Sequence, residues 1–409
     1  MPRPDEKESR PTPESNVTRR TLLKAGTTAL AAAGGASLAG PAGRSQAAGP
    51  QAPQGGEGAA EWRNKQPGMA YRRLGRTGMM ISEVVSGGDP ITLENYKHLE
   101  LALEMGLNYL DMAPAYNNGD TERAYGKLLA GSSARRDRVF LTTKISDFTK
   151  TRDAMYREIF DGLPGEKQRA IRERSRDLRA GRGVEQPGYF LEYFPGERKS
   201  FEPAYLRVAM LPEYGAKVEG SSKLRDVIVS SLEGSLRRVG TDHFDLMMCP
   251  HGANCPEDLT PELAEVFRDL KQQGKVRFLG VTSHNDPAGV LRAAADAGHY
   301  DAAMVAYNVI NGGFLDAAIR HAASKDLGVI AMKAAHAVAT HHKSLQPVPE
   351  WRVAKVERIV PGEWSAPQKA YLWALQNPRI AAVISNLWDE TYVKQNLALA
   401  GRKVEFRPA

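Results

Sequence analysis

Residues 108–129 read NYLDMAPAYNNGDTERAYGKLL, and this stretch decides the fold. A short apolar strand ends at Leu110, and Asp111 and Tyr116 follow in a turn rich in Pro, Asn and Gly. Thr121 then begins an amphipathic helix. A carboxylate and a phenol therefore stand at one junction between a strand and a helix, the place where barrels of alternating strands and helices carry their chemistry. In an arbitrary protein, the carboxylate would only cap the turn and the phenol would pack against it.

Strand and helix patterns alternate along the rest of the chain. The predicted strands end near Gly87, Asp111, Lys144, Cys249, Thr282, Tyr307, Met332 and Ile384. Helix patterns cover residues 92–106, 121–130, 222–239, 261–274, 287–298, 313–326, 365–377 and 389–400. Eight such units predict an α/β fold, a closed parallel (β/α)8 TIM barrel that forms one domain over residues 69–409.

A doubly wound sheet is the alternative fold. Two short strands between Met69 and Val85, joined at Arg76-Thr77-Gly78, predict an N-terminal hairpin ahead of the barrel. The first barrel strand is followed by Ser86-Gly87-Gly88-Asp89-Pro90, which lacks the G-x-G-x-x-G spacing of a dinucleotide-binding turn. The absence of that turn disfavours the doubly wound sheet.

Two segments interrupt the alternation. Residues 149–220 form a long insertion after strand 3, with a charged helix around GEKQRAIRERSRDLRAGRG and then an aromatic run from Tyr189 to Phe194. This insertion is either a solvated helix whose apolar strip folds onto the barrel rim, or a substrate lid or docking surface. Residues 334–364 form a loop after the seventh strand, which we expect to shape the substrate pocket. Its histidines are not matched by a carboxylate pattern, so we predict no metal site from His336, His341 and His342.

Composition excludes several classes of protein. The 409 residues carry a net charge of +7, spread along the chain without a basic stripe interleaved with aromatic residues, so nucleic acid is not an expected partner. Two cysteines, Cys249 and Cys255, are too few for a disulfide scaffold or an all-cysteine iron–sulfur site. They could form a disulfide in an exported protein, but Cys249 is expected on a buried strand, which favours two packed free thiols.

The first residues have the features of an export signal. Thr18-Arg19-Arg20-Thr21-Leu22-Leu23-Lys24 is a twin-arginine motif, and an Ala/Gly-rich run and a small-residue cleavage pattern, Ser45-Gln46-Ala47, follow it. We therefore expect a twin-arginine signal peptide over residues 1–48, recognised by the twin-arginine translocase, and a flexible linker over residues 49–68. The mature protein would be periplasmic or extracellular. A retained anchor is the alternative, but Gly and Ala make the run a poor membrane span.

Four polar residues fall at the ends of consecutive predicted strands: Asp111 and Tyr116 after the second, Lys144 after the third and His251 after the fourth. In a barrel these ends converge on one mouth. Here the sequence resembles the aldo-keto reductase family, roughly over residues 70–400 and outside the insertion. The resemblance rests on the motifs LDMAPAY, LTTK, SLRRVGTDHFDLMMCPH, GKVRFLGVTSH and AYN.

The resemblance implies that Asp111, Tyr116, Lys144 and His251 are catalytic, and their chemistry suits that role. A free tyrosine has a pKa of about 10, so proton donation near neutral pH needs a neighbour that favours the phenolate, and Lys144 can supply that charge. Asp111 would keep Lys144 protonated and oriented. His251 would hydrogen-bond to a substrate carbonyl and polarise it. A hydride would come from a nicotinamide, because no side chain can donate one.

The resemblance also implies a site for NADP or NAD beside the later strands. The residues it places there are Ser283, His284, Met304, Tyr307, Met332, Lys333, Ser385, Asn386, Tyr392 and Asn396. Three depart from the family pattern: His284 replaces the usual Asn, Met304 the usual Gln, and Tyr392 the Arg that meets a 2′-phosphate. No arginine fork for a phosphate is evident, so the choice between NADP and NAD stays open.

Two classes of function remain. The first is an exported NAD(P)H-dependent oxidoreductase that interconverts a small carbonyl compound and an alcohol, with Tyr116 as general acid and base. The second is a non-catalytic nucleotide-binding or regulatory protein on the same barrel. Fold alone does not separate them, because barrels carry many functions. The four intact catalytic residues favour the enzyme, and the departures at the cofactor site favour the alternative.

Overall fold

The computed structural model describes residues 59–130, 133–340 and 347–408, which belong to one compact unit, Ala52–Ala409. The expected signal peptide over residues 1–48 lies outside the described residues. Within the described ranges, no helix combines the length and the apolar composition needed to cross a bilayer.

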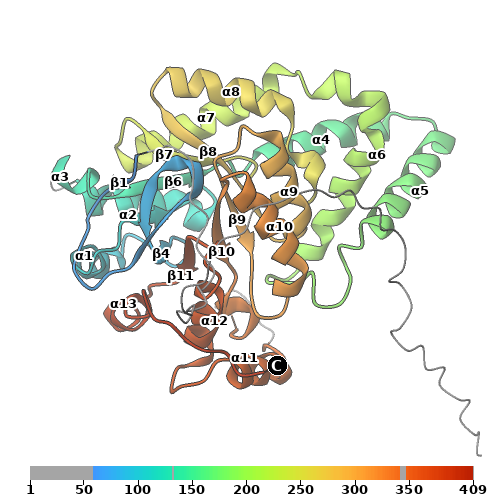
Figure 1. Cartoon of the computed structure of the whole chain (residues 1–409). Coiled ribbons are helices and arrows are strands. Elements are labelled where there is room, and N and C mark those ends of the chain that lie inside the picture. The colour runs from blue at the N-terminus through green and yellow to red at the C-terminus, as the bar shows by residue number, and fades with distance from the viewer. Residues whose placement is uncertain (1–58, 131–132, 341–346, 409) are drawn as a thin grey trace, which may run out of the picture. The chain divides into compact units, whose positions relative to one another are not determined.

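Eight parallel strands close into a barrel, which confirms the predicted (β/α)8 fold (Figure 1). They are β4 (Val84–Gly87), β5 (Tyr109–Asp111), β6 (Phe140–Lys144), β7 (Phe244–Met248), β8 (Val276–Ser283), β9 (Ala302–Ala306), β10 (Gly328–Met332) and β11 (Ala382–Ser385). Around the barrel the strands follow chain order, and β11 pairs with β4. That last pairing excludes an open doubly wound sheet.

The barrel strands read as short apolar runs because both of their faces are buried. In β7, Leu246 and Met248 belong to the apolar cluster inside the barrel, together with Tyr109 and Phe140. Met247, between them, packs in the outer cluster beneath the helices. Full burial of side chains of this size contributes about 1.5–3 kcal/mol each, so the two clusters supply the main driving force for closure.

The eight predicted helices are all present around the barrel. They are α1 (Leu99–Glu104), α2 (Asp120–Leu129), α7 (Ser222–Val239), α8 (Pro261–Gln272), α9 (Pro287–Ala297), α10 (Gly312–Ser324), α12 (Ala366–Leu375) and α13 (Glu390–Leu397). The 3-10 helices are η1 (Gly75–Thr77), η2 (Tyr96–His98), η3 (Tyr116–Gly119), η4 (Glu197–Ser200), η5 (Pro256–Asp258) and η6 (Ala335–Ala337). Two further helices were not predicted, α3 (Ser133–Arg136) and α11 (Glu350–Ile359). α11 lies inside the segment 334–364 that was expected to be a loop, and Pro349 is its N-cap residue.

The N-terminal hairpin is confirmed, and it has a third strand. β2 (Tyr71–Arg73) and β3 (Met79–Ser82) pair antiparallel, and β1 (Glu61–Trp62) pairs parallel with β3. The prediction of a flexible linker over residues 49–68 is therefore wrong for its C-terminal part, which contains β1. Asn64 holds that part against the barrel, since its side-chain amide donates to the carbonyls of Leu103 and Leu107 at 2.6 and 2.9 Å.

The long insertion after β6 is folded. It consists of α4 (Phe148–Asp161), α5 (Gly165–Arg182) and α6 (Phe201–Val218), which gather on one side of the barrel (Figure 1). α5 is the charged helix that was predicted, and Ile171 is its one buried residue. The other two helices were not predicted. α6 is largely buried and carries Pro212, a residue that argues against a helix when only the sequence is read.

Buried ion pairs fasten the insertion to the barrel. Arg152 of α4 bonds to Glu219 at 2.8 Å and to the backbone carbonyl of Glu257 at 3.0 Å. Arg207 of α6 is fully buried and pairs with Asp258 of η5, in the loop that follows β7. Buried guanidinium groups need such partners, because an unpaired charge in the interior is costly. The insertion is thus tied to the loop that leaves the fourth barrel strand.

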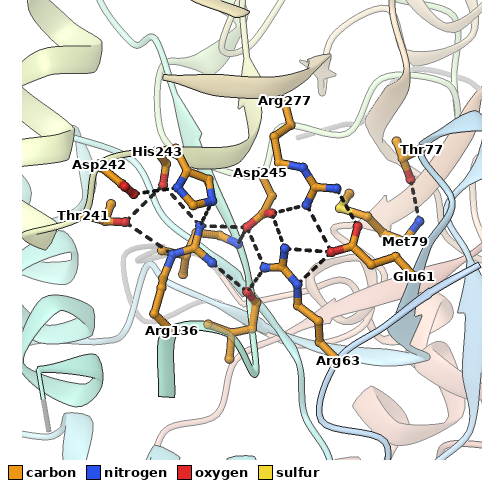
Figure 2. Close-up of polar contacts among 12 residues, drawn as sticks. Glu61, Arg63, Thr77, Met79, Arg136, Thr241, Asp242, His243, Asp245 and Arg277 are labelled. Carbon is orange, nitrogen blue, oxygen red and sulfur yellow. Dashed lines mark hydrogen bonds and ion pairs between the residues drawn. The ribbon is translucent and has the colours of Figure 1, made fainter. Parts of the chain in front are cut away.

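A charge cluster lies at the amino-terminal ends of the barrel strands (Figure 2). Its centre is Asp245 of β7, whose side chain is fully buried. Arg277 donates to Asp245 at 2.6 Å, Arg136 at 3.0 Å and Arg63 at 3.1 Å, and the Leu141 backbone amide donates at 2.9 Å. One carboxylate therefore links β7, β6, β8, the segment after β1 and the end of α3.

The Asp245 carboxylate stays ionised despite its burial. Burial raises its pKa, but the positive charges of Arg136 and Arg63 outweigh burial and hold the pKa below its usual value. The folded state then binds this proton less readily than the unfolded chain. The stability that ionised Asp245 contributes is present above the pKa that this carboxyl has in the unfolded chain. It is lost as the pH falls through the pKa of Asp245 in the folded protein.

We predict that Asp245→Asn lowers the free energy of unfolding by about 3–5 kcal/mol, because three guanidinium groups lose their shared charge partner. Urea-induced unfolding at neutral pH measures this change. The control is Asp269→Asn, which removes an exposed partner of Arg225 and should change stability by less than about 1 kcal/mol. On acidification below about pH 4 the wild-type protein should lose more stability than Asp245→Asn. If the wild-type protein and Asp245→Asn lose equal stability on acidification, the central role of Asp245 is contradicted.

Candidate active site

A cavity of about 560 Å³ opens at the carboxyl ends of the barrel strands. Asp111, Tyr116 and His251 line it. Residues of the loop after β10 form another part of its wall, and these are Ala334, Ala335, His336, Ala339 and Thr340. A pocket of this size at the carboxyl face is where a barrel holds its ligand.

Lys144 lies behind the cavity wall and pairs with Asp111. Its ammonium donates to Asp111 Oδ1 at 2.5 Å and to the Met112 carbonyl at 3.0 Å. Both side chains are almost fully buried. Burial raises the pKa of Asp111 and lowers the pKa of Lys144, and the attraction between the two groups opposes both shifts. The sequence-based expectation that Asp111 orients Lys144 agrees with this geometry.

Tyr116 is placed by an unusual turn. Asn117, Asn118 and Gly119 follow it with φ values of 48°, 54° and 79°, all in the left-handed region that Asn and Gly tolerate. The Asn117 side-chain amide donates to the Asp89 carbonyl at 2.9 Å and so fastens the turn to the loop after β4. The turn holds the half-buried phenol ring at the mouth rather than in the core.

The ring of Tyr116 lies between Lys144 and His251. Lys144 Nζ is 4.6 Å from the ring centroid, and the His251 ring meets it edge to face with centroids 6.0 Å apart. Burial raises the pKa of Tyr116 well above its usual value, and the charges of Asp111 and Asp89 add to the shift. The phenol therefore holds its proton at neutral pH. That Lys144 favours the phenolate once the proton leaves stays a prediction.

His251 is neutral near pH 7. Burial lowers its pKa well below the usual value, and the charges of Lys144, His284 and Lys333 lower it further. Its Nδ1 pairs with the Ser146 hydroxyl at 2.8 Å, which leaves Nε2 as the ring nitrogen available to a ligand. With the Ser146 hydroxyl donating to Nδ1, Nε2 carries the proton and can donate it to a carbonyl oxygen.

The structure brings most of the expected cofactor residues to the same cavity. His284, Met304, Met332, Lys333, Asn386, Tyr392 and Asn396 all line it. Three do not. Ser283 donates to the Ala253 carbonyl at 2.8 Å, Tyr307 accepts from Asn377 at 3.1 Å, and Ser385 accepts from Asn396 at 2.9 Å. These hydroxyls serve the protein's own hydrogen bonding, and Ser385 positions the Asn396 that lines the cavity.

Sequence reasoning missed several residues at the site. Asp89, Phe194, Trp388 and Gln395 line the cavity, and Ser146 supports His251. Asp89 had a readable signal, because it is a carboxylate just after a predicted strand end. Phe194 had none, because its approach to the mouth depends on how the insertion folds back.

The insertion contributes part of the cavity wall. Phe194 lines the cavity, and Lys333 Nζ lies 3.9 Å from its ring centroid. Glu197 of η4 pairs with Nδ1 of His284 at 2.8 Å, and Tyr193 accepts from Asn308 at 2.9 Å. Burial and Lys333 lower the pKa of His284, whereas Glu197 opposes that shift. The insertion therefore matches the first of the two expected alternatives, a solvated helix whose apolar strip folds onto the barrel rim, and that strip also forms part of the cavity wall.

Lys333 is held in a strained backbone conformation, with φ of 61°. The other non-glycine residues with positive φ in the described ranges are Asn64, Asn117, Asn118 and Asp326, types that adopt this region more readily. A lysine there costs on the order of 1 kcal/mol. Such strain at a strand end that faces a cavity is typical of a functional position.

Cys249 and Cys255 are both buried free thiols, which confirms the favoured interpretation. Among the described residues, no group of three or more His, Cys, Asp or Glu side chains is arranged to hold a metal ion. His341 and His342 lie outside those residues.

Comparison with known proteins identifies the family. A family model described as Aldo/keto reductase family matches residues 89–179 and 207–404. The chain belongs to the aldo/keto reductase family. The expectation that all of residues 149–220 lie outside the resemblance is wrong, because the match includes residues 149–179 and 207–220. The stretch left unmatched between the two matched ranges is residues 180–206. It contains the aromatic run that reaches the cavity.

Relatives with curated descriptions are about a quarter identical to this family member over the part that aligns. Aldo-keto reductase AMT2 of Alternaria alternata is 26% identical over 226 residues, which is 52% of this chain and 49% of that protein. The uncharacterized oxidoreductase YqkF of Bacillus subtilis (strain 168) is 27% identical over 218 residues, 53% and 49% of the two chains. The chain thus spans about half the length of the curated relatives it matches.

Among solved structures, aldo-keto reductase AKR11C1 from Bacillus halodurans (holo form) superposes with a TM-score of 0.54 at 20% identity. The alignment covers 82% of this chain and 92% of that one. This likeness supports the barrel fold.

We predict that Asp111→Asn and Lys144→Met each lower the free energy of unfolding by about 3–5 kcal/mol, because each strands a buried partner. The double variant removes both charges, so its loss should be smaller than the sum of the two single losses by at least about 1 kcal/mol. Denaturant unfolding of the four proteins completes the cycle. Additive losses would show that the 2.5 Å contact contributes no coupling.

Proposed function

We propose that this family member is an NAD(P)H-dependent oxidoreductase that interconverts a small carbonyl compound and an alcohol. The observation that carries the proposal is the meeting of Tyr116 and His251 at one cavity, with the Asp111–Lys144 pair directly behind the phenol. A proton donor, a neutral imidazole and a buried cation are the groups that carbonyl reduction requires from a protein. Family membership supports the same reaction class.

The cavity suits a nicotinamide dinucleotide, NADP or NAD. It continues from the catalytic residues to Asn386, Tyr392 and Asn396, and aromatic, amide and sulfur side chains line it along the way. Such a mixture of apolar walls and a few polar groups is typical of a cofactor site. A bound nicotinamide would supply the hydride, which no side chain can donate. His284 and Met304 would lie against the ring end of the cofactor.

The chain's own residues would handle the proton. The raised pKa of Tyr116 keeps the phenol protonated until a stronger base arises beside it, and the alkoxide formed at the substrate oxygen is such a base. His251, neutral and anchored on Ser146, would donate a hydrogen bond to the same oxygen and stabilise its developing charge. As the proton leaves Tyr116, Lys144, whose Nζ lies 4.6 Å from the ring centroid, would stabilise the phenolate. In the reverse direction the phenolate would take the proton back.

We predict that Tyr116→Phe lowers carbonyl-dependent oxidation of NAD(P)H by about 10²- to 10⁴-fold, because the variant loses its proton donor. Nucleotide binding, followed by fluorescence quenching, should stay within about threefold of wild type, since the ring remains. The matched control is Tyr125→Phe. Tyr125 is a buried neighbouring phenol that bonds to Ser86 at 3.0 Å and does not line the cavity, so this variant should keep its activity. Full activity in Tyr116→Phe would overturn the mechanism.

A non-catalytic nucleotide-binding role is the second candidate function. The side chains of Ser283 and His284 are engaged by protein partners, Ala253 and Glu197, where the family resemblance implies contact with the nicotinamide. If the wild-type protein binds nucleotide but turns over no carbonyl compound, this second function is the better description.

We also propose that the protein is exported through the twin-arginine translocase to the periplasm or extracellular space. The support is Arg19-Arg20 in its motif, ahead of the small-residue cleavage pattern. The pathway carries folded proteins, so the nucleotide would be loaded before export.

We predict that Arg19→Lys together with Arg20→Lys leaves full-length precursor in the cytoplasm of a host that has this translocase, because the paired guanidinium groups form the recognised signal. Cell fractionation and mass determination of the mature N-terminus measure the outcome. Arg44→Lys, outside the motif, is the control and should be exported like wild type. Unchanged export of the double variant would refute the assignment.

A further inference from the structure

A second histidine of the cavity is held by the insertion. His284 follows β8 directly and lines the cavity. Its Nδ1 lies 2.8 Å from Glu197 Oε1, and Glu197 belongs to η4 of the insertion. The other oxygen of the same carboxylate accepts from the Tyr193 backbone amide at 2.7 Å. Both oxygens of Glu197 are therefore engaged, and the carboxylate is fixed against the imidazole.

Aromatic rings of the insertion pack on the imidazole. The ring centroids of Tyr193 and Phe194 lie 6.0 and 6.1 Å from that of His284. Tyr193 is itself anchored, because its hydroxyl accepts from the side-chain amide of Asn308 at 2.9 Å. Both aromatic residues belong to residues 180–206, the stretch that the family model leaves unmatched. The support of His284 therefore comes from a part of the chain that the family pattern does not supply.

The charges of the pair decide which nitrogen of His284 carries the proton. Burial raises the pKa of Glu197, but the bond to His284, the Tyr193 amide and the Lys333 charge bring that pKa below its usual value. The carboxylate is thus ionised near pH 7, and an ionised carboxylate only accepts hydrogen bonds. Burial and the Lys333 charge lower the pKa of His284, so its ring is neutral. The single ring proton then lies on Nδ1, and Nε2 is an acceptor.

The two histidines of the cavity offer opposite groups to a ligand. His251 presents an Nε2–H donor, because the Ser146 hydroxyl engages its Nδ1. His284 presents an Nε2 acceptor. The two rings are near enough that the charge of His284 lowers the pKa of His251. A ligand that satisfies both rings has an acceptor oxygen for Tyr116 and His251 and a hydrogen-bond donor for His284.

We propose that Glu197 and His284 select a substrate that carries a hydroxyl group on the carbon beside its carbonyl. The inference rests on the proposed function, because hydride transfer brings the substrate carbonyl to Tyr116 and His251. The carbonyl oxygen accepts from these two side chains, and the neighbouring hydroxyl donates to Nε2 of His284. Glu197 is a positioning residue, since it contacts the imidazole and not the substrate. A substrate without the hydroxyl leaves the imidazole acceptor unpaired, which lowers its kcat/KM.

Nitrogen NMR tests the pair without turnover, on the full chain with its histidine rings isotope-labelled. Comparison with His284→Asn assigns the resonances of His284. In the wild-type protein the ring proton should lie on Nδ1. Hydroxyacetone should shift the Nε2 resonance, and butanone, which has a methyl group in place of the hydroxyl, should not. A proton on Nε2 would overturn the proposal, and so would an Nε2 resonance that NADH shifts and hydroxyacetone does not.

Glu197→Gln tests the positioning role. The amide can donate to Nδ1, which moves the ring proton to Nε2 and turns the acceptor into a donor. The ratio of kcat/KM for hydroxyacetone to kcat/KM for butanone should then fall at least about tenfold. A general disturbance of the site would lower both constants alike and leave this ratio unchanged. The matched control is Glu192→Gln, because Glu192 is exposed on the same loop and accepts from the Gly196 backbone amide at 2.9 Å.

Failure of this inference and failure of the proposed function give different results. If Glu197→Gln is folded by circular dichroism and keeps the wild-type ratio, selection by the hydroxyl is refuted while the reductase function stands. If the wild-type protein reduces neither ketone, the proposed function is contradicted. The NMR shifts then decide by themselves whether His284 binds a hydroxyl.

Discussion

The contact between Lys144 and Asp111 constrains the rest of the site. Two charges sit almost fully buried at the ends of neighbouring strands, and neither tolerates that position without the other. The pair therefore fixes how the end of β6 meets the end of β5. The turn that follows Asp111 begins from this fixed point, and three consecutive left-handed residues then direct the chain so that Tyr116 lies over the ammonium. The catalytic geometry is thus built outward from an ion pair that faces the interior of the protein.

The two faces of the barrel use buried charge differently. At the amino-terminal face Asp245 is surrounded by three guanidinium groups, and their combined attraction keeps its pKa low in spite of burial (Figure 2). At the carboxyl face one ammonium must serve Asp111, with Asp89 and Tyr116 nearby, and burial shifts the pKa of each partner toward its neutral form. In the first arrangement three guanidinium groups surround one carboxylate, and the cluster stabilises the fold. In the second, burial shifts the pKa values of the two partners toward each other, at the face where barrels place their chemistry.

Much of the fold could be predicted from the sequence, because the patterns that mark strands and helices are local. Short apolar runs locate all eight barrel strands, and α7 coincides with its predicted range. What could not be predicted depends on contacts between distant segments. β1 exists because Asn64 and Glu61 find partners at the barrel, and α6 exists despite Pro212 because the barrel side buries it. The raised pKa of Tyr116 comes first from burial of the phenol, which depends on how the loops around the cavity fold.

The candidate site divides in the same way. Asp111, Lys144 and His251 stand at strand ends and could be predicted from position, and Tyr116 follows from its fixed distance to Asp111. Phe194 could not, since it reaches the mouth from an insertion that leaves the barrel after β6 and returns across it. Its return has an electrostatic consequence. Phe194 and Tyr193 cover the Lys333 ammonium, and Glu197 engages His284, so the insertion places aromatic rings and a carboxylate around the Lys333 side of the cavity.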